Sequence, residues 1–190
     1  PVAIFLSQRS LAQWRLLARF GLLLSAIILL ILQVPGVGKT VNGNTNWIAL
    51  PFVDVQPSEL AKFLLILWAG YMLSNEERAG KSRVNVFALI APGFALIMVL
   101  VLLGRDLGTT CVIAAILGGM LFVSGIELRV FGTLIAIGAV AFAGLIATAS
   151  YRVDRFLVVL DPFAAEDYKN AGWQPAHSLL GLATGGILGV

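Results

Sequence analysis

The sequence has few charged side chains and almost no cysteine or histidine. Only 12% of its 190 residues are charged, and it contains one cysteine, Cys111, and one histidine, His177. A typical soluble domain is about 25% charged. A single cysteine excludes a disulfide within the chain, and without His and Cys clusters the chain lacks the ligand spacing of a zinc site. We therefore predict neither a disulfide framework nor a metal site of this kind.

Motifs of other functional classes are missing too. The sequence contains neither a phosphate-binding P-loop nor the G-x-S-x-G turn that carries the nucleophile of many hydrolases. Its net charge is +3, and the Lys and Arg residues are spread along the chain. Because no basic stripe is present, we expect no nucleic-acid partner.

Long apolar runs dominate what remains. Hydrophobic residues make up 59% of the chain, and the mean hydropathy is +0.94. Backbone groups in lipid must be paired within the segment, so the expected element is the helix. The sequence predicts an all-α, polytopic transmembrane bundle with five spans and an incomplete sixth. The predicted spans are residues 16–34, 58–73, 85–103, 108–125, 130–149 and, incomplete, 178–190.

The loops between these runs predict an orientation. With the N-terminus in the cytoplasm, seven Lys and Arg residues lie inside and five outside, as the positive-inside rule favours. Two long loops, 35–57 and 150–177, are then extracytoplasmic. The chain begins with proline, and its last apolar run is 13 residues long, whereas a span needs about 20. We therefore expect residues 1–190 to be a single internal fragment of a longer membrane domain.

Charged residues lie at the start of the second predicted span, in NGNTNWIALPFVDVQPSELAK, residues 42–62. Pro57 suits the first turn of a helix, and Glu59 in that turn is favoured by the helix dipole. Lys62 lies three residues on and is placed to pair with Glu59. Two interpretations stay open: a capped helix with a snorkelling lysine, or a buried ion pair that lines a polar cavity.

The segment GRDLGTT, residues 104–110, precedes the fourth span. Asp106 is placed to cap the following helix by accepting a hydrogen bond from the Thr109 N–H. Arg105 beside it is suited to hold an anionic group, although a cap alone also explains the pattern.

The 150–177 loop carries seven charged residues. A solvated loop of mixed charge explains this composition. The alternative is a site in which a carboxylate accepts a proton and cations hold phosphate at the membrane surface. Its carboxylates are Asp154, Asp161, Glu166 and Asp167, and its cations are Arg152, Arg155 and Lys169.

Four motifs together resemble the SEDS family (shape, elongation, division and sporulation), which includes FtsW and RodA. Residues 42–62 resemble its "NG…RWI…QPSE…K" signature, and GRDLGTT resembles "PDLGT". Residues 151–174 are similar to its "YR…R…DP…D…GYQ" loop, and 177–190 to "QS…A…SGG…G", with the closing GGILGV closer to FtsW. The chain departs from the family pattern at Asn46 (usually arginine), Arg105 (proline), Trp173 (tyrosine) and His177 (glutamine).

The resemblance implies a peptidoglycan glycosyltransferase that polymerises lipid II at the outer face of the bacterial cytoplasmic membrane, during cell division or elongation. The family's essential aspartate lies seven residues before the glutamine of "GYQ", which implies Asp167 as the catalytic residue, with Asp161 as the alternative. The implied substrate-binding residues are Arg152, Arg155, Lys62, Glu59 and Gln174. The implied supporting residues are Asp106, Arg105, Trp47 and Ser58.

The resemblance also implies partners. These are lipid II, a class B penicillin-binding protein, and division or elongation regulators. A divalent cation, Mg or Mn, could share the neutralisation of pyrophosphate, although no residues identify a site for it. Two other functions stay open: a lipid II flippase, and a non-catalytic scaffold for a transpeptidase. Because family members have about ten spans, we expect the 190-residue fragment alone to be inactive.

Overall fold

The structure is a computed structural model that describes residues 2–41, 44–49, 54–78, 86–148, 153, 157–164, 168–169, 172–186 and 189. The chain divides into two compact units, Pro1–Thr133 and Leu134–Val190. Each unit is described by itself below. The helices are α1 (Val2–Ser7), α2 (Leu11–Leu32), α3 (Pro57–Arg78), α4 (Val86–Leu103), α5 (Leu107–Val123), α6 (Leu128–Ala147) and α8 (Trp173–Gly185), and the strands are β1 (Lys39–Val41), β2 (Asn44–Ala49) and β3 (Asp54–Val55).

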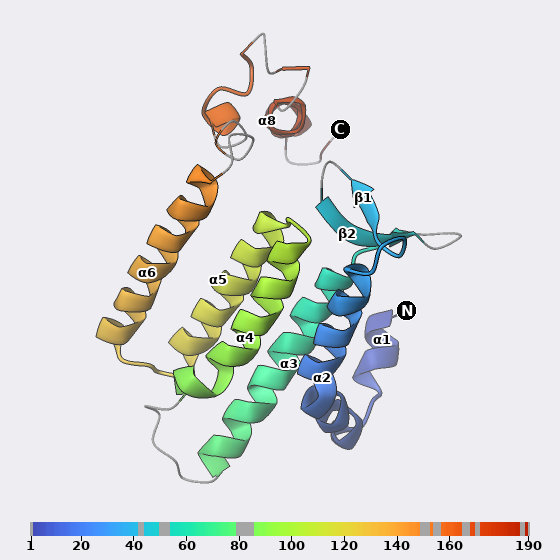
Figure 1. Ribbon diagram of the computed structural model, residues 1–190, viewed down its shortest axis with the longest axis vertical. Coiled ribbons are helices and arrows are strands. Elements are labelled where there is room, and N and C mark those ends of the chain that lie inside the picture. The colour runs from blue at the N-terminus through green and yellow to red at the C-terminus, as the bar shows by residue number, and fades with distance from the viewer. Residues whose placement is uncertain are drawn as a thin grey trace. The chain divides into compact units, whose positions relative to one another are not determined.

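Four helices of the first unit, α2 to α5, form a bundle in which successive helices run in opposite directions (Figure 1). Helix α2 packs mainly on α3, and α4 packs on α5, while α4 also contacts α2 and α3. The core of the bundle is therefore shared among several helices. Its most deeply buried large side chains are Leu64, Leu65, Ile90, Phe94, Ile97 and Ile113.

Small residues bring the backbones of α2 and α3 close together. A Cβ atom added to Gly21 would lie 2.7 Å from the carbonyl oxygen of Leu64. One turn further along α2, the buried Ser25 hydroxyl lies 2.8 Å from the Gly21 carbonyl oxygen and 3.5 Å from that of Ala61. Small residues at such crossings are what lets membrane helices pack tightly.

Replacing Gly21 by alanine is expected to lower the stability of the full-length protein by about 1–3 kcal/mol, because the new methyl group meets backbone that cannot rotate away. Gly70→Ala is the matched control: it lies on α3, and its added Cβ meets nothing within 4 Å. Thermal unfolding in detergent measures both. Equal midpoints for the Gly21 and Gly70 variants would contradict the close approach.

Among the described residues, α2, α4 and α6 are long and apolar enough to cross a membrane, and α5 is a shorter apolar helix. Helix α3 has 22 residues but is less apolar, with Glu59 in its first turn. A helix stands at each predicted span, although the bounds differ. Helix α2 begins at residue 11 instead of 16, α3 ends at 78 instead of 73, and α8 begins at 173 instead of 178. The structure confirms a mostly helical chain with apolar helices long enough to cross a membrane, and the number of spans stays a prediction.

The all-α prediction was wrong in the 35–57 loop. There β1, β2 and β3 form a three-stranded antiparallel sheet, close to the end of α2 and the start of α3 (Figure 1). Val41 pairs with Asn44, so two residues, which the sequence gives as Asn-Gly, join the first two strands. The three strands were not predicted from the sequence because they are short.

Candidate functional site

A buried carboxylate connects two of the sequence motifs. Asp106 is only 8% exposed. Its Oδ2 atom accepts hydrogen bonds from Asn46 Nδ2 at 2.7 Å, from Gln56 Nε2 at 3.3 Å and from Thr109 Oγ1 at 2.7 Å, while Oδ1 accepts from the Thr109 N–H at 2.9 Å. We call Asp106, Asn46, Gln56 and Thr109 the Asp106 hub. Four donors to one buried carboxylate offset the cost of removing its charge from water.

The turn between α4 and α5 places this carboxylate. The chain leaves α4 through Arg105, which has a φ of 62°, and the Arg105 and Asp106 N–H groups donate to the carbonyls of Leu102 and Val101. A left-handed residue after a helix is usually glycine. The sharp reversal sets Asp106 at the first turn of α5 as its N-cap. The predicted cap on the Thr109 N–H is confirmed.

The hub ties the small sheet to the bundle. Asn46 belongs to β2, and Gln56 immediately precedes α3, so two separate parts of the 42–62 motif bind the same carboxylate. Neither residue was predicted to bind Asp106. The one feature of the sequence that could have pointed to them is that both are uncharged polar residues close to an apolar span. Spacing cannot show which carboxylate, 50 or 60 residues further along the chain, they bind.

The predicted pairing of Glu59 and Lys62 is confirmed. Lys62 Nζ lies 2.8 Å from Glu59 Oε1, and the side chains are 18% and 59% exposed, respectively. The Lys62 side chain is therefore mostly covered, while that of Glu59 is open to the surroundings. A second pair at this end, between Lys39 and Asp54 at 2.6 Å, is exposed on both sides. The two ion pairs differ in the burial of the cation, which favours Lys62 over Lys39 as a functional residue.

The other supporting residues differ in burial. Ser58 is 1% exposed, and its hydroxyl oxygen has no hydrogen-bond partner among the described residues. Trp47 is half-buried in β2, while Arg105 is exposed. Ser58 and Trp47 therefore belong to the packed end of the bundle, whereas the Arg105 side chain is open to the surroundings.

The second unit contributes fewer described residues. Asp161 follows a short helical segment at 157–160, and Gln174 lies in the first turn of α8, and both are exposed. The predicted site residues Asp167, Arg152 and Arg155 lie outside the described residues. So do two other charged residues of the 150–177 loop, Asp154 and Glu166. Their roles stay predictions.

His177 lies one turn after Trp173 on α8 and takes part in an aromatic cluster. Its ring centroid is 3.7 Å from that of Trp173 and 5.7 Å from that of Tyr168, and its Nδ1 atom lies 2.8 Å from the Trp173 carbonyl oxygen. These contacts give the lone histidine a packing role. Among the described residues, no three His, Cys, Asp or Glu side chains gather in a way that could hold a metal ion.

Relatives named "Probable peptidoglycan glycosyltransferase FtsW" match most of this chain. That of Legionella pneumophila is 39% identical over 165 residues, which is 85% of this chain and 41% of the relative. That of Haemophilus influenzae is 38% identical over 186 residues, which is 96% of this chain and 45% of the relative. The chain thus spans less than half the length of these relatives.

Two kinds of solved structure share the fold. One is described as structural coordination of polymerization and crosslinking by a peptidoglycan synthase complex; it has a TM-score of 0.67 and 30% identity, and the match covers 97% of this chain and 54% of that one. The other is the rod shape determining protein RodA of Thermus thermophilus, with a TM-score of 0.59, 30% identity, and coverage of 76% and 45%. The family model of FtsW, RodA and SpoVE, described as "Cell cycle protein", matches residues 2–190. This chain therefore belongs to the FtsW/RodA/SpoVE family of cell cycle proteins.

Proposed function

We propose that the protein polymerises lipid II into glycan strands at the outer face of the cytoplasmic membrane. The observation that carries the proposal is the similarity of nearly the whole chain to relatives named as peptidoglycan glycosyltransferases. The likeness to a complex that coordinates polymerization and crosslinking supports the same activity. Because this chain covers part of those proteins, the activity belongs to the full-length protein.

The contacts within the first unit support an ordered substrate-binding surface at one end of the bundle. The Asp106 hub fixes the sheet and the first turn of α3 against the start of α5, and Lys62 stands on the second turn of α3. In the proposed orientation this end faces outward, as does the 150–177 loop. The five complete spans and the extracytoplasmic position of both long loops are part of this proposal.

The proposed reaction joins a sugar 4-hydroxyl of one lipid II to the anomeric carbon of another. Asp167 takes the hydroxyl proton as general base, the new glycosidic bond forms, and undecaprenyl pyrophosphate leaves with its electron pair. Arg152, Arg155 and Lys62 neutralise the charge that develops on the pyrophosphate. Glu59 orients Lys62 through their ion pair, and Gln174 contacts the substrate.

Crosslinking of the strands is a transpeptidase reaction, so we also propose a class B penicillin-binding protein as partner. The description of the solved complex, which names both polymerization and crosslinking, supports this choice.

Lys62 gives a direct test of the proposed surface. Lys62→Gln in the full-length protein is expected to lower the rate of lipid II polymerisation about tenfold or more, because one largely covered cation near the leaving group is lost. The thermal midpoint should change little, since an i,i+3 helical pair whose carboxylate is open to the surroundings contributes only about 0.5 kcal/mol. The assay follows fluorescent lipid II into glycan strands on a gel.

Lys39→Gln is the matched control, because Lys39 is a cation in the same region whose ion pair is exposed on both sides. Its variant should keep the wild-type rate. Equal losses of polymerisation in both variants would contradict a specific role for Lys62. The loss would then be a general effect of surface charge.

A further inference from the structure

A second site lies at the opposite end of the α2–α3 pair. A cavity of about 470 Å³ opens between the first two turns of α2 and the second half of α3. We call it the α2–α3 groove. Its lining residues are Leu11, Trp14, Arg15 and Ala18 from α2, and Ile66, Leu67, Gly70, Tyr71, Ser74 and Asn75 from α3. The groove is away from the Asp106 hub, and the proposed polymerisation makes no use of it.

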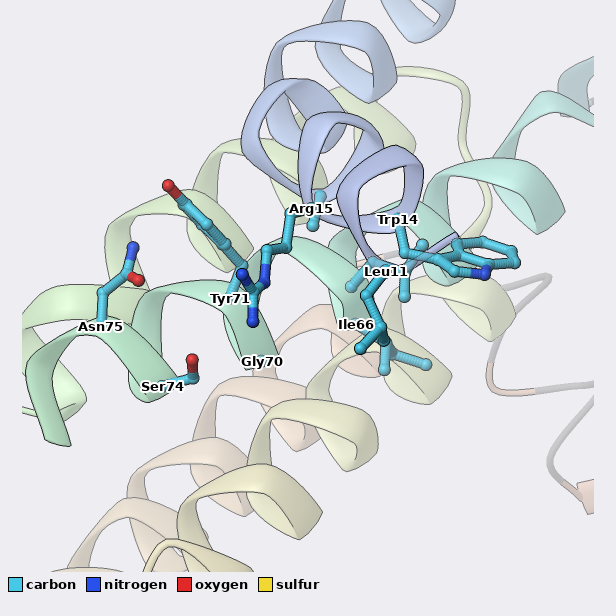
Figure 2. A pocket seen from close by; sticks show the side chains of 10 residues that line it. Leu11, Trp14, Arg15, Ile66, Gly70, Tyr71, Ser74 and Asn75 are labelled. Carbon is cyan, nitrogen blue, oxygen red and sulfur yellow. The ribbon is translucent and has the colours of Figure 1, made fainter. Parts of the chain in front are cut away.

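The lining is divided by chemistry. Figure 2 shows Arg15 extending from α2 toward the stretch of α3 that holds Gly70 and Tyr71, with Ser74 and Asn75 further along the helix. Arg15, Tyr71, Ser74 and Asn75 supply guanidinium, hydroxyl and amide donors. No carboxylate is present among the lining residues that the structure describes. A guanidinium in a groove that also holds neutral donors suits a phosphate group.

The remaining lining is apolar. Leu11, Ala18, Ile66 and Leu67 line the same groove, and the Trp14 ring packs edge-on against Phe63 with centroids 6.1 Å apart. Tryptophan is enriched where membrane meets water. A ligand that matches both parts has an anionic head and a hydrocarbon tail.

The position of the groove along the two predicted spans agrees with such a ligand. The predicted membrane boundaries of the two spans, residues 16 and 73, both fall within the lining segments 11–18 and 66–75. This end carries the excess of Lys and Arg and is therefore cytoplasmic in the proposed orientation. Basic pockets between membrane helices on that side bind anionic lipid headgroups.

We propose that the α2–α3 groove binds one anionic phospholipid of the cytoplasmic leaflet, with its phosphate on Arg15 and its first acyl carbons on the leucine and isoleucine wall. The volume of the groove fits a glycerophosphate head, since small-molecule pockets are about 300–1,000 Å³. Gly70 leaves the floor open, because a Cβ there would meet nothing within 4 Å. The leaflet follows from the proposed orientation, but the binding itself does not depend on it.

Native mass spectrometry of the full-length protein tests the proposal. The protein is taken from nanodiscs that contain equal amounts of phosphatidylglycerol and phosphatidylcholine. Wild type should retain phosphatidylglycerol in preference. Arg15→Gln, which removes the cation, and Gly70→Leu, which fills the groove, should each lower this retention about fivefold or more. Inorganic phosphate in millimolar excess should leave the lipid bound.

Two controls lie on other helices. Arg129→Gln removes a cation from the start of α6, and Gly119→Leu enlarges a glycine of α5 whose added Cβ also meets open space. Both should retain lipid as wild type does. Unchanged retention in Arg15→Gln and Gly70→Leu, equal retention of the zwitterionic lipid, or displacement by free phosphate would each overturn the proposal.

Discussion

Asp167→Asn in the full-length protein is expected to lower lipid II polymerisation by at least about 100-fold, since a general base contributes 10²–10⁴ to a rate. Asparagine has nearly the same shape as aspartate but cannot accept the proton of the sugar hydroxyl. The thermal midpoint and the amount of bound lipid II should stay close to those of wild type. The rate is measured from the growth of labelled glycan strands under substrate saturation.

Asp161→Asn is the matched variant. Asp161 lies in the same loop and is exposed, and it precedes the proline of the "DP" pair. Its variant should keep most of the activity. If Asp161→Asn is inactive while Asp167→Asn polymerises normally, the catalytic role passes to Asp161. Full activity in both variants would contradict general-base catalysis by this loop.

The second large effect is expected on stability. Asp106→Ala should lower the free energy of unfolding by about 2–4 kcal/mol, because it removes a helix cap and the charged partner of three other donors. Asn46 and Gln56 then lose the carboxylate that holds the sheet on the bundle. A lower thermal midpoint in detergent reports the loss, and polymerisation should fall with it as the sheet loosens from the bundle.

Asp54→Ala provides the comparison for this loss. Asp54 also sits in the small sheet, but its ion pair with Lys39 is exposed, and such pairs contribute about 0–1 kcal/mol. Asp106→Asn should fall between the two, since it keeps an oxygen acceptor but loses the charge. An Asp106→Ala protein that melts like wild type would show that the hub does not fix the sheet to the bundle.

Much of the helical framework could be predicted from the sequence, because the information is local. Apolar runs of span length set the helices, Pro57 marks the first residue of α3, and Asp106 caps α5 through the Thr109 three residues on. The pair of Glu59 and Lys62 follows from helical spacing in the same way. In each case the interacting groups lie within one turn of one another.

The features that the sequence did not predict depend on contacts between residues that lie far apart in the chain. Nothing in the spacing of Asn46 and Gln56 shows that they share the carboxylate of Asp106, because that contact exists only after α3 and α5 pack. The α2–α3 groove is hidden for the same reason, since Arg15 and Tyr71 are 56 residues apart in the sequence. The aromatic surroundings of His177 likewise became visible only in the folded α8 segment.

Polymerisation by the purified full-length protein is the most direct test that this chain is part of a polymerase. The reaction contains defined lipid II and the monofunctional class B penicillin-binding protein, with no other glycosyltransferase. Long glycan strands that appear with wild type and not with Asp167→Asn are the predicted result. A folded wild-type protein that makes no strands, yet moves lipid II between the leaflets of a liposome, would contradict the polymerase and establish a flippase.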